Sequence, residues 1–310
     1  MDNQKEIGNW ILGHAHLLDL KIERMGWIQN WFPEHKDFKI SFSTPDGILT
    51  GRGIDTDEDT ALLKAFSELV ERSVCSGHGI NSNGVAAHYD RDSAILNARK
   101  ELIERDAILC HHLTGKPFFF NQRPSRYDEL KLALFGLGMD LNFAEAICSV
   151  DGFHVVVCRV SGRDQFGSFW GFGCDTDLDK AFDHASFECM INVSSHIHGN
   201  YGLVPSSQNL GRGLDHQRFH FSESISELRV IENFNVPSPI LSMDEIEFIE
   251  LGAEVSPLAS APLFVIQAKS SLLQTMFYGE ADETKINMER LNVFAGEKLK
   301  EFSRVPHPIG

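Results

Sequence analysis

The chain contains two segments with closely matching sequences, and this repetition limits the folds that it can adopt. Residues 51–68 read GRGIDTDEDTALLKAFSE, and residues 171–188 read GFGCDTDLDKAFDHASFE. Both segments contain two glycines, an Asp-Thr-Asp sequence, a further Asp, two alanines and a final glutamate at identical spacing. Such matched spacing predicts a duplicated structural unit in which a glycine-containing turn leads into a helix.

A third segment repeats part of the pattern. Ser82-Asn83-Gly84 leads to Ala94, Ala98 and Glu101, which have the same Ala-x3-Ala-x2-Glu spacing. Two of the three segments then continue as Glu-x-x-Glu-Arg, at residues 68–72 and 101–105. We therefore expect three internally repeated Gly-turn-helix units.

The spacing places small and acidic side chains on one face of each helix. Steps of four and three residues bring Ala61, Ala65 and Glu68 onto one stripe, and Glu71 lies within one turn of Glu68. Three such helices could pack through their alanines and bring their carboxylates together. Clustered carboxylates repel one another unless cations lie among them, and magnesium that carries phosphate oxygens suits such a cluster. Two alternatives remain open, namely solvated helix faces and a duplicated structural unit without a site.

These segments resemble a known family. The sequence SNGVAAH at 82–88, followed by Ala94, Ala98 and ELIERDA at 101–107, closely resembles the signature of the YcaO domain. Residues 51–72 resemble the Gly-x-Gly…Glu-x-x-Glu-Arg element of that family, and residues 171–188 resemble its Gly-x-Gly-x-Asp…Ala-x-x-x-Ala-x-x-Glu element. The resemblance covers roughly residues 41–200.

The resemblance implies an ATP- and magnesium-dependent enzyme that phosphorylates the oxygen of a peptide backbone amide. The expected reaction is cyclodehydration of Cys, Ser or Thr to azolines in a ribosomally synthesised peptide. Two alternatives are a thioamide- or amidine-forming enzyme and a nucleotide-binding pseudoenzyme that scaffolds a partner. A carboxylate-bridged dimetal helix bundle is disfavoured, because the helices lack Glu-x-x-His pairs.

The resemblance also implies roles for individual residues. Those expected to hold magnesium are Glu68, Glu71, Glu101, Glu104 and Glu188. Those expected to contact the nucleotide are Ser82, Asn83, Arg105 and Glu188. Those expected to act in catalysis are Glu104, Arg105, which would neutralise the transferring phosphoryl group, and Pro308 of the C-terminal tail. An alternative for Arg105 is a simple helical ion pair with Glu101.

The chain departs from the family pattern at three places. One is the segment Cys110, His111 and His112, because an aromatic residue commonly follows the Glu-Arg-Asp element in the family. Lys64 stands where many members have serine, and Ile191 followed by Asn192 stands where glutamine is usual. The tail Val305–Gly310 has two of the alternating prolines typical of the family, and a plain disordered end is the alternative interpretation.

Composition indicates a cytoplasmic globular protein. The net charge of −16 over 310 residues disfavours binding to nucleic acid and anionic membranes, and favours a basic or neutral peptide. No segment approaches a membrane-spanning length of apolar residues, and the first residues lack the features of a signal peptide. The six scattered cysteines are expected to be reduced core residues, and the fourteen histidines surface or interface residues.

Hydrophobic patterns predict an α+β fold with antiparallel or mixed sheets, and the resemblance implies that residues 1–310 form one YcaO-like domain. We expect a hairpin over 40–51, strands over 153–161, 167–173 and 263–269, and helices near 57–78, 91–114, 126–137 and 177–195. Residues 1–40 are expected to be an extension, 41–200 the core, 201–225 a mobile loop and 226–310 the remainder.

The length of the N-terminal segment also indicates which partners the protein needs. Residues 1–40 are too short for the small winged-helix module that captures the leader of a precursor peptide in this family. The resemblance therefore implies a precursor peptide as substrate and a separate leader-binding protein as partner, and it allows a homodimer.

Overall fold

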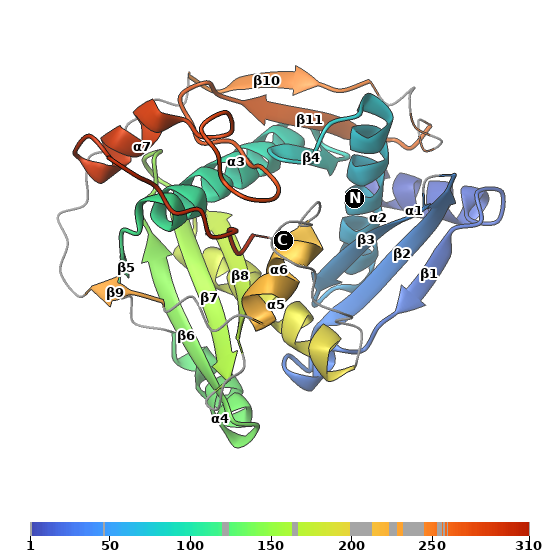
Figure 1. The fold of residues 1–310 in the computed structure, drawn as a ribbon. Helices are drawn as coiled ribbons and strands as arrows, with labels where there is room; N and C mark the ends of the chain where they lie inside the picture. The colour runs from blue at the N-terminus through green and yellow to red at the C-terminus, as the bar shows by residue number, and fades with distance from the viewer. Residues whose placement is uncertain are drawn as a thin grey trace. The chain divides into compact units, whose positions relative to one another are not determined.

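A computed structural model describes residues 2–45, 47–119, 124–162, 167–198, 213–222, 228–231, 245–252, 256, 258 and 260–309 (Figure 1). The fold is a mixture of helices with antiparallel and mixed sheets, as the sequence predicts. The chain divides into two compact units, unit 1 with residues 1–102 and 246–269, and unit 2 with residues 103–245 and 270–310. Whether these two units make up one catalytic domain stays a prediction.

Unit 1 has two three-stranded antiparallel sheets. Its elements are α1 (Asp2–His14), β1 (Lys21–Arg24), η1 (Ile28–Asn30), β2 (Lys36–Thr44), β3 (Gly47–Asp55), α2 (Glu58–His78), β4 (Val85–His88), β10 (Glu247–Glu250), β11 (Phe264–Lys269) and the start of α3 (Arg91–Thr114). The sheets have the strand orders β1-β2-β3 and β10-β11-β4. The predicted hairpin is confirmed, because β2 pairs with β3 from Lys36↔Asp55 to Thr44↔Gly47.

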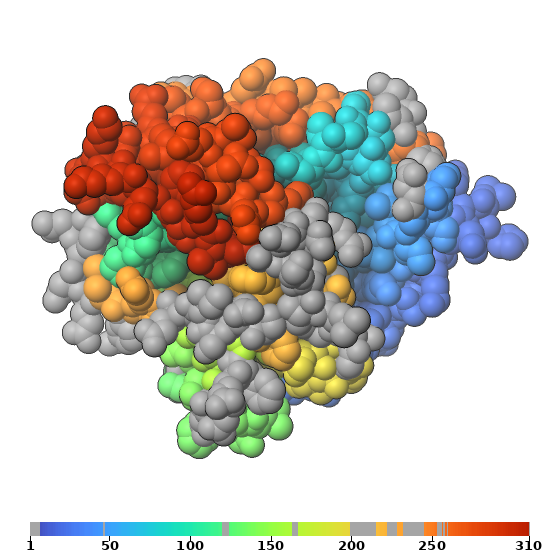
Figure 2. Space-filling model, in the orientation of Figure 1, coloured from blue at the N-terminus to red at the C-terminus, as the bar shows by residue number. Residues whose placement is uncertain are grey.

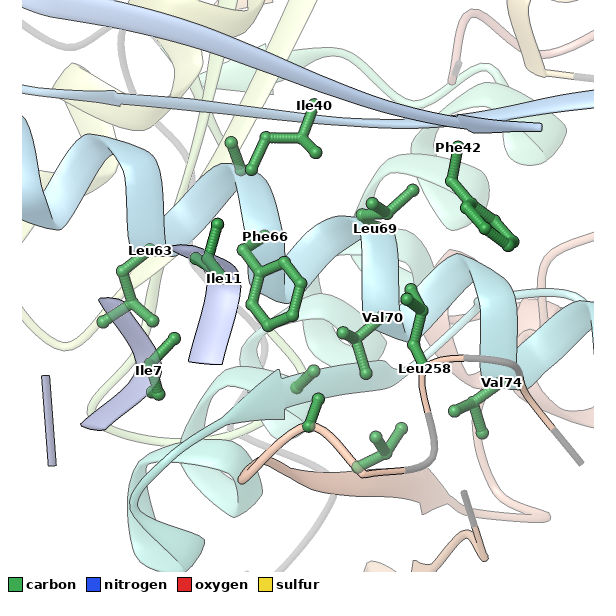
Figure 3. Packing of buried hydrophobic residues seen from close by; sticks show 14 of the residues in the cluster. Ile7, Ile11, Ile40, Phe42, Leu63, Phe66, Leu69, Val70, Val74 and Leu258 are labelled. Atoms are coloured by element: carbon green, nitrogen blue, oxygen red, sulfur yellow. The ribbon is translucent and has the colours of Figure 1, made fainter. Parts of the chain in front are cut away.

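The hydrophobic core of unit 1 lies along α2. Figure 3 shows Ile7 and Ile11 of α1 beside Leu63 and Phe66 of α2. Phe66 is completely buried, and each such side chain contributes roughly 1.5–3 kcal/mol to stability through its removal from water. The segment expected to be an N-terminal extension therefore supplies part of this core.

Two glycines of β3 allow α2 to approach the strand closely. A Cβ atom on Gly51 would lie 2.0 Å from the carbonyl oxygen of Ala65, and one on Gly53 would lie 2.0 Å from that of Ala61. Helix α2 begins after Asp57, whose side chain accepts a hydrogen bond from the backbone N–H of Thr60. The glycines and alanines of the sequence pattern are thus the residues at the closest contacts between α2 and β3.

Within the residues that the structure describes, unit 2 has a mixed sheet with the strand order β8-β7-β6-β5-β9, in which β5 and β9 are parallel and the other neighbouring pairs are antiparallel. Its strands are β5 (Phe118–Phe119), β6 (Met139–Ala146), β7 (His154–Gly162), β8 (Ser168–Asp175) and β9 (Val230–Ile231). Its helices are the rest of α3, η2 (Ser125–Tyr127), α4 (Asp128–Gly136), α5 (Leu178–Ile197), α6 (Gly213–Ser222) and α7 (Met288–Ala295).

Helix α5 packs on β8 with the same kind of close approach. A Cβ atom on Gly171 would lie 2.2 Å from the carbonyl oxygen of Ala185, and one on Gly173 would lie 2.2 Å from that of Ala181. The side chain of Asp177 caps α5 by accepting from the backbone N–H groups of residues 179 and 180. The contacts of β8 with α5 therefore match those of β3 with α2.

One prediction about the C-terminal half is wrong. The sequence predicts a loop over 201–225, but residues 213–222 form α6, while 201–212 and 223–225 lie outside the described residues. The helix was missed because buried His216 and His220 look like surface residues in a sequence pattern. No helix within the described residues is long and apolar enough to cross a membrane.

Candidate functional site

Three of the predicted glutamates line one cavity in unit 1. Glu68 and Glu71 come from α2 and Glu101 comes from α3, and together they line a cavity of about 390 Å³. We call this the carboxylate cavity. Strand β4 completes the lining with the backbone and small side chains of Val85, Ala86 and Ala87.

Glu68 is held in place from two sides. Its Oε2 accepts a hydrogen bond of 2.6 Å from the backbone N–H of Arg52 in β3. Its Oε1 lies 2.5 Å from the guanidinium of Arg72, one turn later on α2. The side chain is 31% exposed, so it is positioned by the protein and still reaches the cavity.

The carboxylates of Glu71 and Glu101 act electrostatically on the same thiol. Burial raises the pKa of Cys75 to about 12, and the negative charges of Glu71 and Glu101 add to this shift. Cys75 is therefore a neutral thiol at pH 7 and is unsuited to act as a nucleophile. All six cysteines are free, and five of them are buried as predicted, whereas Cys148 is half-buried.

The donor atoms of the carboxylate cavity fit magnesium. Besides the glutamates, the lining includes Ser67, whose buried Oγ has no hydrogen-bond partner. Among the described residues, no three acidic, histidine or cysteine side chains already lie close enough together to hold a metal alone. Magnesium takes only one or two carboxylates and fills its other positions with water and phosphate oxygens. These donors therefore suit a magnesium–nucleotide complex better than a bare ion.

Ser82 and Asn83 lie in a turn before a strand, and not before a helix as the sequence analysis assumed. The backbone N–H of Val85 donates to the carbonyl of Ser82, and β4 follows at once. Helix α3 begins only at Arg91. The helix dipole therefore gives these two residues no affinity for anions, although the Oδ1 atom of Asn83 is buried and unpartnered.

Lys64, one of the departures from the family pattern, also lines the carboxylate cavity. Its ammonium donates 2.7 Å to a carboxylate oxygen of Asp55 and 3.2 Å to the carbonyl of Ile54. The lysine thus brings a positive charge to the rim of the cavity.

The other predicted site residues belong to unit 2. Glu104 and Arg105 form an ion pair of 2.9 Å on α3, with 12% and 15% of their side chains exposed. Glu188 on α5 accepts a hydrogen bond of 2.6 Å from the backbone N–H of Phe172 in β8. Asn192, another departure from the family pattern, donates to the carbonyl of Trp170. The structure therefore brings Glu68, Glu71 and Glu101 together, and it describes Glu104, Arg105 and Glu188 as members of the other unit.

The sequence analysis missed Asp106, which follows Arg105 directly. Its carboxylate is fully buried and binds both Nε and Nη2 of Arg290, at 2.9 and 2.7 Å. It also accepts from the backbone N–H of Gln274. Asp106 therefore anchors the second half of α3 to the C-terminal segment.

The C-terminal tail is folded against buried histidines. His112 donates 2.7 Å to the carbonyl of Val305, and His220 donates 2.5 Å to that of Pro306. His216 donates 3.0 Å to the carbonyl of His307. Pro308 lines a second cavity, and parts of the segment after residue 270 are visible at the surface in Figure 2, drawn in orange to red. The alternative of a disordered tail is wrong for residues 305–309.

The chain is similar to a family model and to solved structures of known proteins. The model of a family described as YcaO cyclodehydratase, ATP- and Mg²⁺-binding, matches residues 79–247. The fold is similar to YcaO from Methanopyrus kandleri bound with AMPPCP and Mg²⁺, with a TM-score of 0.58 and 14% identity over 91% of this chain and 95% of that chain. It is also similar to a heterocyclase in complex with substrate and cofactor, with a TM-score of 0.62 and 14% identity over 98% of this chain and 57% of that chain. No curated protein matches the sequence.

Proposed function

Because the chain belongs to the YcaO family, whose cofactors are ATP and Mg²⁺, we propose that it activates backbone amides of a peptide by ATP-dependent phosphorylation of the amide oxygen. The proposed reaction is cyclodehydration, in which transfer of the γ-phosphoryl group to the amide oxygen releases ADP. A neighbouring Cys, Ser or Thr side chain then attacks the amide carbon, and loss of inorganic phosphate and a proton leaves the azoline. The observation that supports this proposal is the carboxylate cavity with Glu68, Glu71 and Glu101 in its wall.

In this proposal the residues of unit 1 bind and orient the nucleotide. Bound magnesium would supply positive charge against the phosphate oxygens. Glu68 and Glu101 would hold it from α2 and α3, with Ser67 as a further oxygen donor in the lining of the cavity. The hydrogen bond from Arg52 fixes one carboxylate oxygen of Glu68, so less of its motion is lost on binding.

The remaining assignments stay proposals. We propose that Glu104, Arg105 and Glu188 serve the same nucleotide, with Arg105 neutralising charge on the phosphoryl group. We also propose that residues 51–68, 171–188 and the segment from Ser82 to Glu101 are three repeated units. The matching contacts at Gly51 and Gly171 support the first pair of repeats.

We further propose that the substrate is a precursor peptide and that a second protein binds its leader. The chain spans 57% of the heterocyclase chain that it resembles, which leaves room in such enzymes for other modules. Robust turnover of a full-length precursor by this chain alone would contradict the need for a partner.

Calorimetric titration with magnesium and AMPPCP tests the nucleotide site. The substitution Glu101→Gln removes one negative charge without creating a hole, and it should weaken nucleotide binding at least about tenfold. The substitution Glu104→Gln tests the proposed role of Glu104 in the same way. Glu129→Gln on α4 is the matched control, because Glu129 is an exposed helical glutamate outside the cavity. Unchanged affinity in both Glu101→Gln and Glu104→Gln would show that the site assignment is wrong.

A further inference from the structure

Unit 2 contains a second cavity, of about 450 Å³, whose chemistry differs from that of the carboxylate cavity. Its walls come from the end of α3, from β5, β8 and α6, and from the C-terminal tail. Phe118, Trp170 and Phe172 line it, together with the cations Lys116 and Arg229. We call it the aromatic cavity. None of the described residues in its lining is a carboxylate.

The aromatic walls form an apolar surface suited to a flat group. Trp170 and Phe172 are two residues apart on β8, so they share one face of the sheet. Their rings are nearly parallel, with an interplanar angle of 13° and centroids 6.3 Å apart. Phe118 is stacked on His111 at 4.3 Å. Fixed rings of this kind bind another ring through stacking or edge-to-face contacts.

Trp170 also carries a hydrogen-bond donor that is not used. Only 4% of the residue is exposed, and its indole Nε1–H has no partner. A buried donor without a partner is unfavourable, so most are satisfied in folded proteins. Because Trp170 lines the cavity, a ligand bound there can supply the missing acceptor after a small movement of the side chain. The unpaired donor therefore indicates that the ligand carries an acceptor such as a carbonyl or carboxylate oxygen.

The charge of the cavity comes from its two cations. His112 and His220 use N–H groups to hold the tail, and burial lowers the pKa of both, to about 3 for His220. Both histidines are therefore neutral at pH 7. The ammonium of Lys116 donates to the carbonyl of Phe294, whereas Arg229 is exposed. Positive charge without a carboxylate disfavours a basic ligand and favours a neutral or acidic one.

We propose that the aromatic cavity binds an aromatic residue of the peptide substrate. The ring lies against Phe118, Trp170 and Phe172, and an oxygen of the peptide accepts from the indole N–H of Trp170. This inference rests on the proposed function for the identity of the ligand as a peptide. It narrows the substrate to a segment with an aromatic residue and neutral or acidic neighbours, whereas the net charge of the whole chain favours a basic or neutral peptide.

Nuclear magnetic resonance on the full chain labelled with ¹⁵N-tryptophan tests the proposal directly. The chain has four tryptophans, so it gives four indole signals, and Trp170→Phe assigns the one of interest. The probe is the dipeptide acetyl-Asp-Phe-amide. Its controls are acetyl-Asp-Leu-amide, which lacks the ring, and acetyl-Lys-Phe-amide, which reverses the charge.

We expect acetyl-Asp-Phe-amide to shift the Trp170 signal saturably and to leave the other three in place. It should bind at least about fivefold more tightly than either control dipeptide. Arg229→Gln should reduce the preference for the acidic dipeptide over the basic one, because Lys116 remains in the lining. Arg304→Gln should keep that preference, because Arg304 is an exposed arginine of the same unit that does not line the cavity.

Two results would overturn the inference. The Trp170 signal could stay in place with every dipeptide, or the leucine dipeptide could bind as well as the phenylalanine one. Titration of the full chain with magnesium and AMPPCP distinguishes a failure of the aromatic site from a failure of the proposed function. Nucleotide binding without a Trp170 shift would refute the aromatic site alone. A Trp170 shift without nucleotide binding would refute the proposed function and leave a peptide-binding site.

Discussion

The β3–α2 segment of unit 1 and the β8–α5 segment of unit 2 have the same local geometry and different surroundings. In each, two strand glycines lie against helix carbonyls, and an aspartate caps the helix. The glutamate of each helix accepts a hydrogen bond of 2.6 Å from the backbone N–H between the two glycines. The two sequences differ three residues after this glutamate, where the first has Glu71 and the second has Ile191.

The difference shows which parts of the site are set by the backbone and which by neighbouring side chains. Glu68 lies in the wall of the carboxylate cavity with two further acidic side chains. Phe172, whose N–H binds Glu188, lines the aromatic cavity. The shared geometry therefore fixes the position of one glutamate, while the neighbouring residues decide whether the nearby cavity suits a metal–phosphate complex or an aromatic ring.

The largest expected loss of stability follows from breaking the buried ion pair in either unit. Asp106 binds Arg290 through two bonds, and Asp37 binds Arg52 in the same way. Asp106→Asn should lower the free energy of unfolding by about 3–5 kcal/mol, because it leaves a buried guanidinium unpaired. Asp37→Asn should cost less, because the side chain of Arg52 is 17% exposed and that of Arg290 only 1%. Urea unfolding measures both losses, and an equal loss would contradict this ranking.

A second prediction tests whether the two glycine contacts are equivalent. Gly51→Ala and Gly171→Ala each place a methyl group about as close to a helix carbonyl, so each should lower the free energy of unfolding by about 3 kcal/mol. Gly8→Ala in α1 is the control, because its added Cβ meets nothing within 4 Å and alanine favours a helix. If only one of the two variants is destabilised, the two packings are not equivalent.

A smaller effect concerns the pH dependence of unit 2. Burial lowers the pKa of His111 to about 4 and that of His220 to about 3, and the charges of His112, His216 and Arg159 lower that of His220 further. The unfolded chain binds these protons near pH 6.5, so their stabilisation is complete above pH 6.5 and is lost as the pH falls toward 4 and 3. The loss should approach about 1.4 kcal/mol per pH unit for each histidine.

Thermal unfolding between pH 7 and pH 4 measures this loss. His220→Gln keeps a donor for the carbonyl of Pro306 but does not titrate, so it should reduce the slope. His16→Gln is the control, since His16 is exposed in unit 1. A slope that is unchanged in His220→Gln would contradict the assignment of a buried neutral histidine.

The sequence predicted the parts of the fold that depend on local spacing. Close packing of a helix on a strand requires glycine and alanine at fixed intervals, so Gly51, Ala65 and Glu68 could be placed before the structure was known. Contacts between distant residues leave no such pattern. Asp106 and Arg290 are 184 residues apart in the sequence, so their pairing could not be read from spacing.

The histidines were misinterpreted for a related reason. His112, His216 and His220 each bind a carbonyl of the tail, and His216 and His220 are buried. Polar residues buried in this way break the apolar periodicity by which a helix is recognised, which is why α6 was predicted to be a loop. Strand β4, between Gly84 and α3, was not predicted because it is only four residues long. Without this strand, Ser82 and Asn83 were predicted to lie directly before a helix.

The anomalous diffraction of manganese, bound with AMPPCP in crystals of the full chain, tests the central claim most directly. Manganese accepts the same oxygen ligands as magnesium, and its position can be located without reference to the protein. The account predicts manganese coordinated by at least one of Glu68, Glu71 and Glu101, with phosphate oxygens completing its ligands. Manganese and phosphates bound away from the carboxylate cavity, with these three glutamates uncoordinated, would contradict it.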